Sequence, residues 1–206
     1  MIPIVFEDDI DLMHFADEFI VKDRLASLEN DVNRCLPTAK IEATEYAPFP
    51  ALMYCFSIVD LLGSLYAGNA RSRKTTENAA RYIEKYMNYP EDKRRLLQKI
   101  YRHKIVHLSQ PKFAMLHNKQ IIAWKQEEGV ISTIDPTPGY VNIPGRSGKI
   151  YCNAQYIISI VTLKDDIKNS VVRSPDGYME DLRNNNGLQS KFVTAINQIF
   201  DPVITD

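Results

Sequence analysis

Apolar residues recur at intervals of three and four along the first part of the chain, the spacing that places them on one side of an α-helix. This pattern begins after Asp8 and Asp9, which suit the capping of a helix, and it stops before Pro37. Residues 51–66 are apolar nearly all round. A segment of that kind is typical of a buried central helix.

Two further helices are expected before Pro111. The first would be capped by Thr75 or Thr76 and would carry apolar residues as far as Met87. The second would begin at Pro90, because proline is favoured in the first turn, and would carry an apolar stripe as far as Leu108.

The pattern then changes to short β-rich runs separated by glycine and proline, at 120–124, 130–134 and 140–143, with 149–152 as a further candidate strand. These runs predict a small antiparallel meander with Trp124 and Tyr151 in its core. Helical spacing returns with a helix capped by Asn153, and a last helix ends at Pro202.

The prediction is therefore a mainly α protein with a single domain over residues 1–206. It would consist of a helical core at about 8–110, an antiparallel β-meander inserted near residues 115–152, and C-terminal helices at about 153–201. A hydrophobic content of 45% and a charged content of 25% fit an ordinary globular protein.

The cysteines and the absence of targeting signals bear on the compartment. Cys35, Cys55 and Cys152 are odd in number and widely spaced, which argues against a disulfide framework and against a zinc site. No purely apolar run approaches the roughly 18 residues that span a bilayer, and the N-terminus lacks the features of a signal peptide. We expect a cytoplasmic protein with no membrane partner and no metal or other cofactor.

The charge is distributed unevenly along the chain. Residues 71–104 contain eleven Lys and Arg against four acidic residues, which gives +7. Because the whole chain carries −1, the remainder carries −8. Such a segment is either a solvated helix face or the footprint of a polyanionic partner such as RNA.

The basic segment ends on the hexapeptide Arg102-His103-Lys104-Ile105-Val106-His107, at the end of the predicted helix. An Arg followed by His, then three further residues and a second His, with a buried helix earlier in the sequence, resembles the motif of the HEPN superfamily of helical proteins. The resemblance is clearest over residues 50–110. It implies a HEPN-like helical bundle, and many members of the superfamily are ribonucleases.

The resemblance implies metal-independent cleavage of RNA, with Arg102 and His107 as catalytic residues and His103 and Lys104 as auxiliary ones. The residue types suit this chemistry, since an imidazole exchanges protons near neutral pH and a guanidinium stabilises phosphate charge. On an ideal helix, Arg102 and His107 would lie about 140° apart. Either the last turn is distorted or a second chain completes the site. The resemblance implies a homodimer, because HEPN-type nucleases usually bring two such motifs together across a dimer.

Other polar residues are candidates for supporting roles. Asp60, within the apolar helix, would pair with Arg102 or Lys104 and orient it, although a structural buried pair is equally compatible. The candidates for binding the RNA backbone are basic residues of the same segment: Arg71, Arg73, Lys74, Arg94 and Arg95. For Arg71, Arg73 and Lys74 the alternative is an ordinary solvated loop.

Three functions remain open at this point. The first is an endoribonuclease, including the toxin or defence type, with an antitoxin or regulatory protein as a further partner. The second is a non-catalytic HEPN-like module that binds RNA, a nucleotide or a protein. The third is a helical interaction protein in which the motif has no catalytic role.

Overall fold

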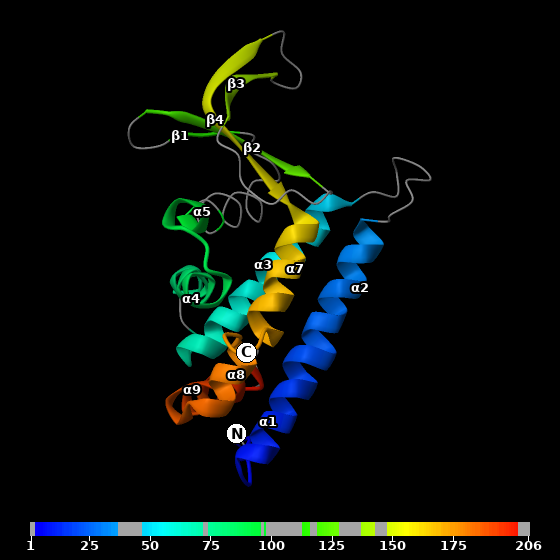
Figure 1. The fold of residues 1–206 in the computed structure, drawn as a ribbon, viewed down its shortest axis with the longest axis vertical. Coiled ribbons are helices and arrows are strands. Elements are labelled where there is room, and N and C mark those ends of the chain that lie inside the picture. The colour runs from blue at the N-terminus through cyan, green and yellow to red at the C-terminus, as the bar shows by residue number, and fades with distance from the viewer. Residues whose placement is uncertain are drawn as a thin grey trace, which may run out of the picture.

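The computed structural model describes residues 3–36, 47–71, 74–95, 97, 113–115, 119–127, 137–142 and 148–201. Within these ranges the chain is mostly helical, and a small sheet stands at one end of the helical body (Figure 1). The N-terminal segment lies beside the last helix, where the amide of Asn197 accepts a hydrogen bond from the backbone N–H of Ile4 (2.6 Å) and donates one to its carbonyl oxygen (3.2 Å).

The first helical segment consists of α1 (Asp9–Ala16), the π-helical stretch η1 (Asp17–Leu25) and α2 (Ala26–Cys35). The predicted cap is confirmed, because the Asp8 carboxylate accepts hydrogen bonds from the backbone N–H groups of Ile10 and Asp11, each at 2.9 Å. The π-helical stretch spans the interval between the buried residues Ile20 and Leu25. Its wider turn keeps residues five positions apart on the same side of the helix.

The predicted central helix is α3 (Pro48–Ala67), which is buried along most of its length and ends at Gly68 with a left-handed φ of 73°. By length and composition alone α3 is long and apolar enough to cross a membrane, with a mean hydropathy of 1.4 over an 18-residue window, although Asp60 interrupts its apolar run. Its burial is that of a core helix. It packs against four helices: α2, α4 (Thr75–Tyr82), α7 (Ile160–Val172) and α9 (Asn186–Ile199).

Shorter helical segments complete the body. After α4 come η3 (Ile83–Met87) and α5 (Glu91–Arg95), while α8 (Tyr178–Asn184), which the sequence pattern missed, precedes α9. The expected threonine cap of α4 was wrong. Lys74 occupies the N-cap position, and no side chain caps the helix.

The sheet contains β1 (Phe113–Met115), β2 (Ile121–Glu127), β3 (Thr137–Asn142) and β4 (Lys149–Ser159), in the order β1-β2-β4-β3. β1–β2 and β3–β4 are antiparallel, but β2 and β4 are parallel. The predicted antiparallel meander is therefore wrong, and the sheet is mixed. The strand expected at 130–134 falls outside the described residues.

The helix predicted to begin at Asn153 begins at Ile160 instead, because β4 continues to Ser159. The Ser159 hydroxyl caps α7 by accepting a hydrogen bond from the N–H of Thr162 at 3.1 Å. Asn153 lies within the sheet, where its side-chain oxygen accepts a hydrogen bond from the N–H of Ile121 at 2.9 Å. It joins two strands rather than starting a helix.

Candidate functional site

The candidate motif lies outside the described residues. Arg102, His103, Lys104 and His107 fall between Leu97 and Phe113, and Arg73 is likewise outside the described part of the chain. The elements that flank the motif in the sequence are described. Leu97 is 1% exposed and belongs to the core of the helical body, and β1 begins at Phe113.

Asp60 is half-buried on α3, and one of its carboxylate oxygens is shielded from solvent. Its backbone carbonyl accepts a hydrogen bond from the hydroxyl of Ser64 at 2.9 Å. The pairing of Asp60 with Arg102 or Lys104 involves residues outside the described structure and stays a prediction.

Arg71 is engaged within the molecule, because its guanidinium forms an ion pair with Asp201 after α9. The same loop is also tied to α9 by its backbone. The side-chain oxygen of Gln198 accepts hydrogen bonds from the N–H groups of Ala70 (2.7 Å) and Arg71 (3.2 Å). The connection between α3 and α4 is therefore anchored to the C-terminal helix at Ala70 and Arg71.

Arg94 is mostly buried, with 19% of its side chain exposed, and pairs with Glu84 of η3 at 2.5 Å. Its Nε atom is buried and has no hydrogen-bond partner in the described part of the chain. Lys74 is exposed and directly precedes α4. Arg95 is the last residue of α5, and its side chain lies outside the described structure.

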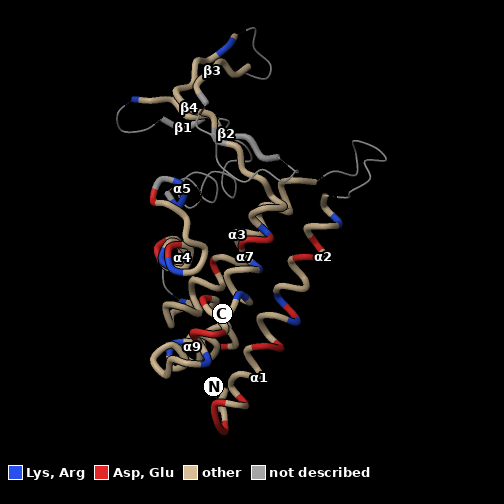
Figure 2. Tube along the Cα trace, in the orientation of Figure 1, with Lys and Arg blue, Asp and Glu red and all other residues tan. Residues whose placement is uncertain are grey.

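Acidic residues offset much of the described basic segment (Figure 2). Arg81 pairs with Glu77 on α4, and Lys85 pairs with Asp181 of α8 at 3.5 Å. Glu77 is already counted in the +7, whereas Asp181 belongs to the −8 carried by the rest of the chain and faces the basic segment in the same molecule. Exposed ion pairs of this kind contribute about 0–1 kcal/mol each, so phosphates can replace the carboxylates at little cost.

A cluster of four tyrosines, from α3, α4, η3 and α8, was not predicted from the sequence. The rings of Tyr66, Tyr82, Tyr86 and Tyr178 contact one another with centroids 5.0–6.4 Å apart. Its hydroxyls also link helices. Tyr86 donates to Asp181 at 3.0 Å, and a hydrogen bond of 2.9 Å joins Tyr82 to Ser170. The cluster fixes α4 and η3, which precede the motif in the sequence, against α7 and α8.

Removal of two different hydroxyls of this cluster should change the free energy of unfolding in opposite directions. Tyr178 is fully buried, and its hydroxyl has no hydrogen-bond partner within the described residues. We expect Tyr178→Phe to raise the free energy of unfolding by about 1 kcal/mol, because an unsatisfied buried hydroxyl is lost. Tyr82→Phe, the matched control, should lower it by about 1 kcal/mol through loss of the hydrogen bond to Ser170. Urea unfolding of both variants measures the difference, and equal effects would contradict this account.

The same burial makes the protein sensitive to alkali. Burial raises the pKa values of Tyr82 and Tyr178, so the native state retains both phenolic protons above about pH 10, where the unfolded chain releases them. The stabilisation is complete below that pH and is lost as the pH rises, by up to about 1.4 kcal/mol per pH unit for each group. Urea unfolding at about pH 8 and about pH 11 should show this loss, and Tyr82→Phe should lose less than wild type. A urea midpoint that did not change between these two pH values would contradict this prediction.

The sequence prediction for Tyr151 was wrong. Its side chain is 49% exposed on β4 rather than buried in the sheet, and it contacts Tyr140 of β3. The side chain of Trp124 lies outside the described structure. Hydrophobicity alone gave no signal for this exposure, because the face that a strand residue occupies depends on the pairing register.

Three properties limit the metal binding and the nucleophilic chemistry that the described residues can support. Over the described ranges, no group of three or more His, Cys, Asp or Glu side chains is placed to bind a metal ion. The three cysteines are free, and burial raises the pKa of the Cys55 thiol to about 12, so this thiol is unsuited to nucleophilic chemistry. His14 is exposed on α1.

Comparison with known proteins adds no relative. No family model matches the chain, and no curated protein or solved structure matches it either. The resemblance to the HEPN superfamily therefore stays a prediction from the sequence, based on Arg102, His103 and His107 and on the helices predicted around them.

Proposed function

We propose that this chain is a HEPN-type endoribonuclease that cleaves RNA without a metal ion, with Arg102 and His107 as its catalytic residues. The observation that carries the proposal is the Arg-His-x-x-x-His sequence at the end of a segment with a charge of +7. His103 and Lys104 assist, and Asp60 orients one of the basic groups. A toxin or defence role restrained by a regulatory protein belongs to the same proposal.

The reaction can be followed atom by atom. The ribose 2′-oxygen attacks the adjacent phosphorus as its proton passes to a neutral imidazole, and a P–O bond forms. The bond from phosphorus to the 5′-oxygen breaks, and an imidazolium protonates that oxygen. The products are a 2′,3′-cyclic phosphate and a 5′-hydroxyl. Arg102 stabilises the charge that builds on the phosphate oxygens.

One imidazole cannot be the base and the acid in the same step. A second one must come from His103 or from His107 of another copy of the chain. The sequence predicts His107 at a helix C-terminus, and such a position would favour the protonated imidazole, which suits the acid. The expected angle of about 140° between Arg102 and His107 also favours a site built from two chains. We therefore propose a homodimer in which each motif completes the other.

The described structure supports this proposal in two ways. The helical body supplies a buried anchor, Leu97, five residues before Arg102 in the sequence, and β1 begins six residues after His107. In chain order, the motif therefore joins the helical body to the sheet. Arg81 and Lys85 present exposed basic groups whose exposed carboxylate partners can be exchanged for phosphates at little cost.

The direct test is cleavage of a single-stranded RNA by the purified full chain in excess chelator. We expect new 5′-hydroxyl ends and 2′,3′-cyclic phosphate ends, since the 2′-oxygen is the nucleophile. An RNA carrying 2′-O-methyl groups throughout should remain intact, because it lacks the proton and the nucleophile. Cleavage of the methylated RNA, or cleavage that requires a metal, would rule out this mechanism. RNA binding that weakens with salt, without cleavage, would identify the non-catalytic module instead.

A further inference from the structure

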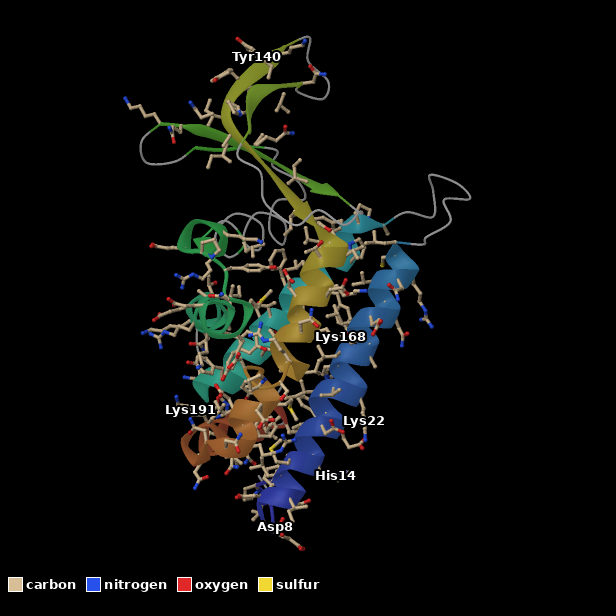
Figure 3. The ribbon with its side chains drawn as sticks, viewed as in Figure 1. Asp8, His14, Lys22, Tyr140, Lys168 and Lys191 are labelled. Carbon is tan, nitrogen blue, oxygen red and sulfur yellow. The ribbon has the colours of Figure 1, made fainter. Side chains whose placement is uncertain are left out.

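Two tyrosines lie side by side on the exposed face of the sheet. Tyr140 of β3 and Tyr151 of β4 are direct cross-strand partners, with ring centroids 5.3 Å apart and an angle of 67° between the ring planes. Tyr140 is 71% exposed and Tyr151 is 49% exposed. Figure 3 shows Tyr140 at the end of the sheet that is farthest from the helical body.

The strand register fixes what else shares this face. Side chains alternate between the two faces of a strand, and Lys149 and Tyr151 are exposed while Cys152 is buried. Asn142 is the cross-strand partner of Lys149, and both lie two positions from the tyrosine pair on their strands. Exposed ammonium and amide groups therefore stand beside the rings on the same face.

The chemistry of this face matches a particular ligand. The described residues of β3 and β4 include no Asp or Glu, although the chain as a whole carries −1. Aromatic rings stack on the bases of unpaired nucleotides, lysine attracts phosphates, and asparagine can hydrogen-bond to base edges. An apolar peptide would leave the ammonium and amide groups without partners, so it fits the face less well.

We propose that the Tyr140–Tyr151 pair, with Lys149 and Asn142 beside it, binds unstacked bases of single-stranded RNA. This inference rests on the proposed function, in which RNA is the substrate. β4 leads from this pair into α7 of the helical body, and the nine residues from Tyr151 to Ser159 extend at most roughly 30 Å. RNA bound at the pair is therefore held at a distance from α7.

The test uses the full wild-type chain and a labelled 2′-O-methyl oligonucleotide of about a dozen nucleotides, which can be bound but not cleaved. Fluorescence anisotropy should show binding about 10-fold weaker for Tyr140→Ala and about 100-fold weaker for the double variant with Tyr151→Ala. The matched control, Tyr140→Phe with Tyr151→Phe, keeps both rings and should bind like wild type. An abasic oligonucleotide, which keeps the phosphates, should bind all forms equally.

Several outcomes would overturn the inference. One is undiminished binding by the double alanine variant. Another is an equal loss on the abasic strand, which would indicate a phosphate site without stacking. A change from dimer to monomer in light scattering, with no direct effect on RNA, would identify the face as a protein interface. Because cross-strand aromatic pairs also stabilise sheets, thermal unfolding must show that the variants remain folded.

The failure of this inference can be separated from failure of the proposed function. If wild type cleaves RNA and the tyrosine variants bind it normally, only the stacking platform is wrong. If wild type neither cleaves nor binds RNA, the ribonuclease proposal falls and the platform falls with it. If binding depends on the tyrosines but no RNA is cleaved, the platform holds and the catalytic proposal is wrong.

Discussion

Replacing His107 by Ala should reduce RNA cleavage by about 100- to 10,000-fold, and Arg102→Ala should reduce it by about 100-fold or more. The histidine variant loses the group that transfers a proton, and the arginine variant loses the permanent charge on the phosphate. Arg102→Lys should restore only part of the activity, because an ammonium keeps the charge without the planar pair of donors. Initial rates on one RNA substrate, with product ends identified, measure these effects.

The matched control is His14→Ala. His14 is exposed on α1, far from the sheet (Figure 3), and its loss should leave the rate within about twofold of wild type. Thermal unfolding of each variant separates loss of chemistry from loss of fold. Near-normal cleavage by both Arg102→Ala and His107→Ala would show that the motif is not the catalytic site, whatever activity the wild type has.

Mixing the two inactive variants tests whether the site is shared between chains. If Arg102 of one chain acts with His107 of the other, each mixed dimer contains one site with both native residues. Random exchange makes half of the dimers mixed, so about a quarter of the wild-type activity should return. If Arg102 and His107 act within one chain, no mixed dimer contains an intact site and activity should not return.

Local signals in the sequence predicted the helices better than the sheet. The cap at Asp8, the apolar stripe from Leu12 to Val32 and the mostly apolar helix α3 are patterns within single segments, and all three are confirmed. The π-helical stretch was not predicted, because its signal is only the five-residue interval between the buried residues Ile20 and Leu25. In the sequence Val21 is also apolar and lies four residues before Leu25, which is ordinary α-helical spacing.

The arrangement of the sheet could not be predicted, because it depends on contacts between distant segments. The run Tyr156 to Leu163 is almost continuously apolar, and periodicity cannot tell a buried strand from a buried helix in such a run. In the folded chain, residues 154–159 pair with β2, and Lys125 lies opposite Ile157. Because of this pairing, the strand continues to Ser159. The parallel pairing is set in the folded state, and no residue within β4 reveals it.

In the candidate site, too, a pattern within one segment could be predicted and contacts between distant segments could not. A motif such as Arg102 to His107 is visible because its residues are close in sequence. The partners of its neighbours are not visible, since Arg71 pairs with Asp201 and Tyr86 bonds to Asp181 across long stretches of chain. The charge of +7 was therefore a correct count, but part of it is offset within the molecule, which the sequence alone could not indicate.

Gly63→Ala should lower the free energy of unfolding by about 3 kcal/mol and the melting temperature by about 10 °C, because α3 and α4 touch backbone to backbone at this position. A Cβ atom at Gly63 would lie 2.6 Å from both the nitrogen and the Cα of Ala79, and 2.8 Å from the carbonyl carbon of Asn78. Backbone atoms cannot rotate aside as a side chain does, so α4 itself must move. The gain of about 1 kcal/mol in helix propensity is too small to offset this displacement.

Gly148→Ala is the matched control, because a Cβ there meets no atom of the described structure within 4 Å, and stability should change by less than about 0.5 kcal/mol. Denaturant unfolding of the two variants under one set of conditions measures the contrast. Since α4 leads through η3 and α5 toward Arg102 in the sequence, Gly63→Ala should also reduce RNA cleavage at temperatures where the variant remains folded. If both variants unfold at the same denaturant midpoint, the close approach of α3 and α4 at Gly63 is wrong.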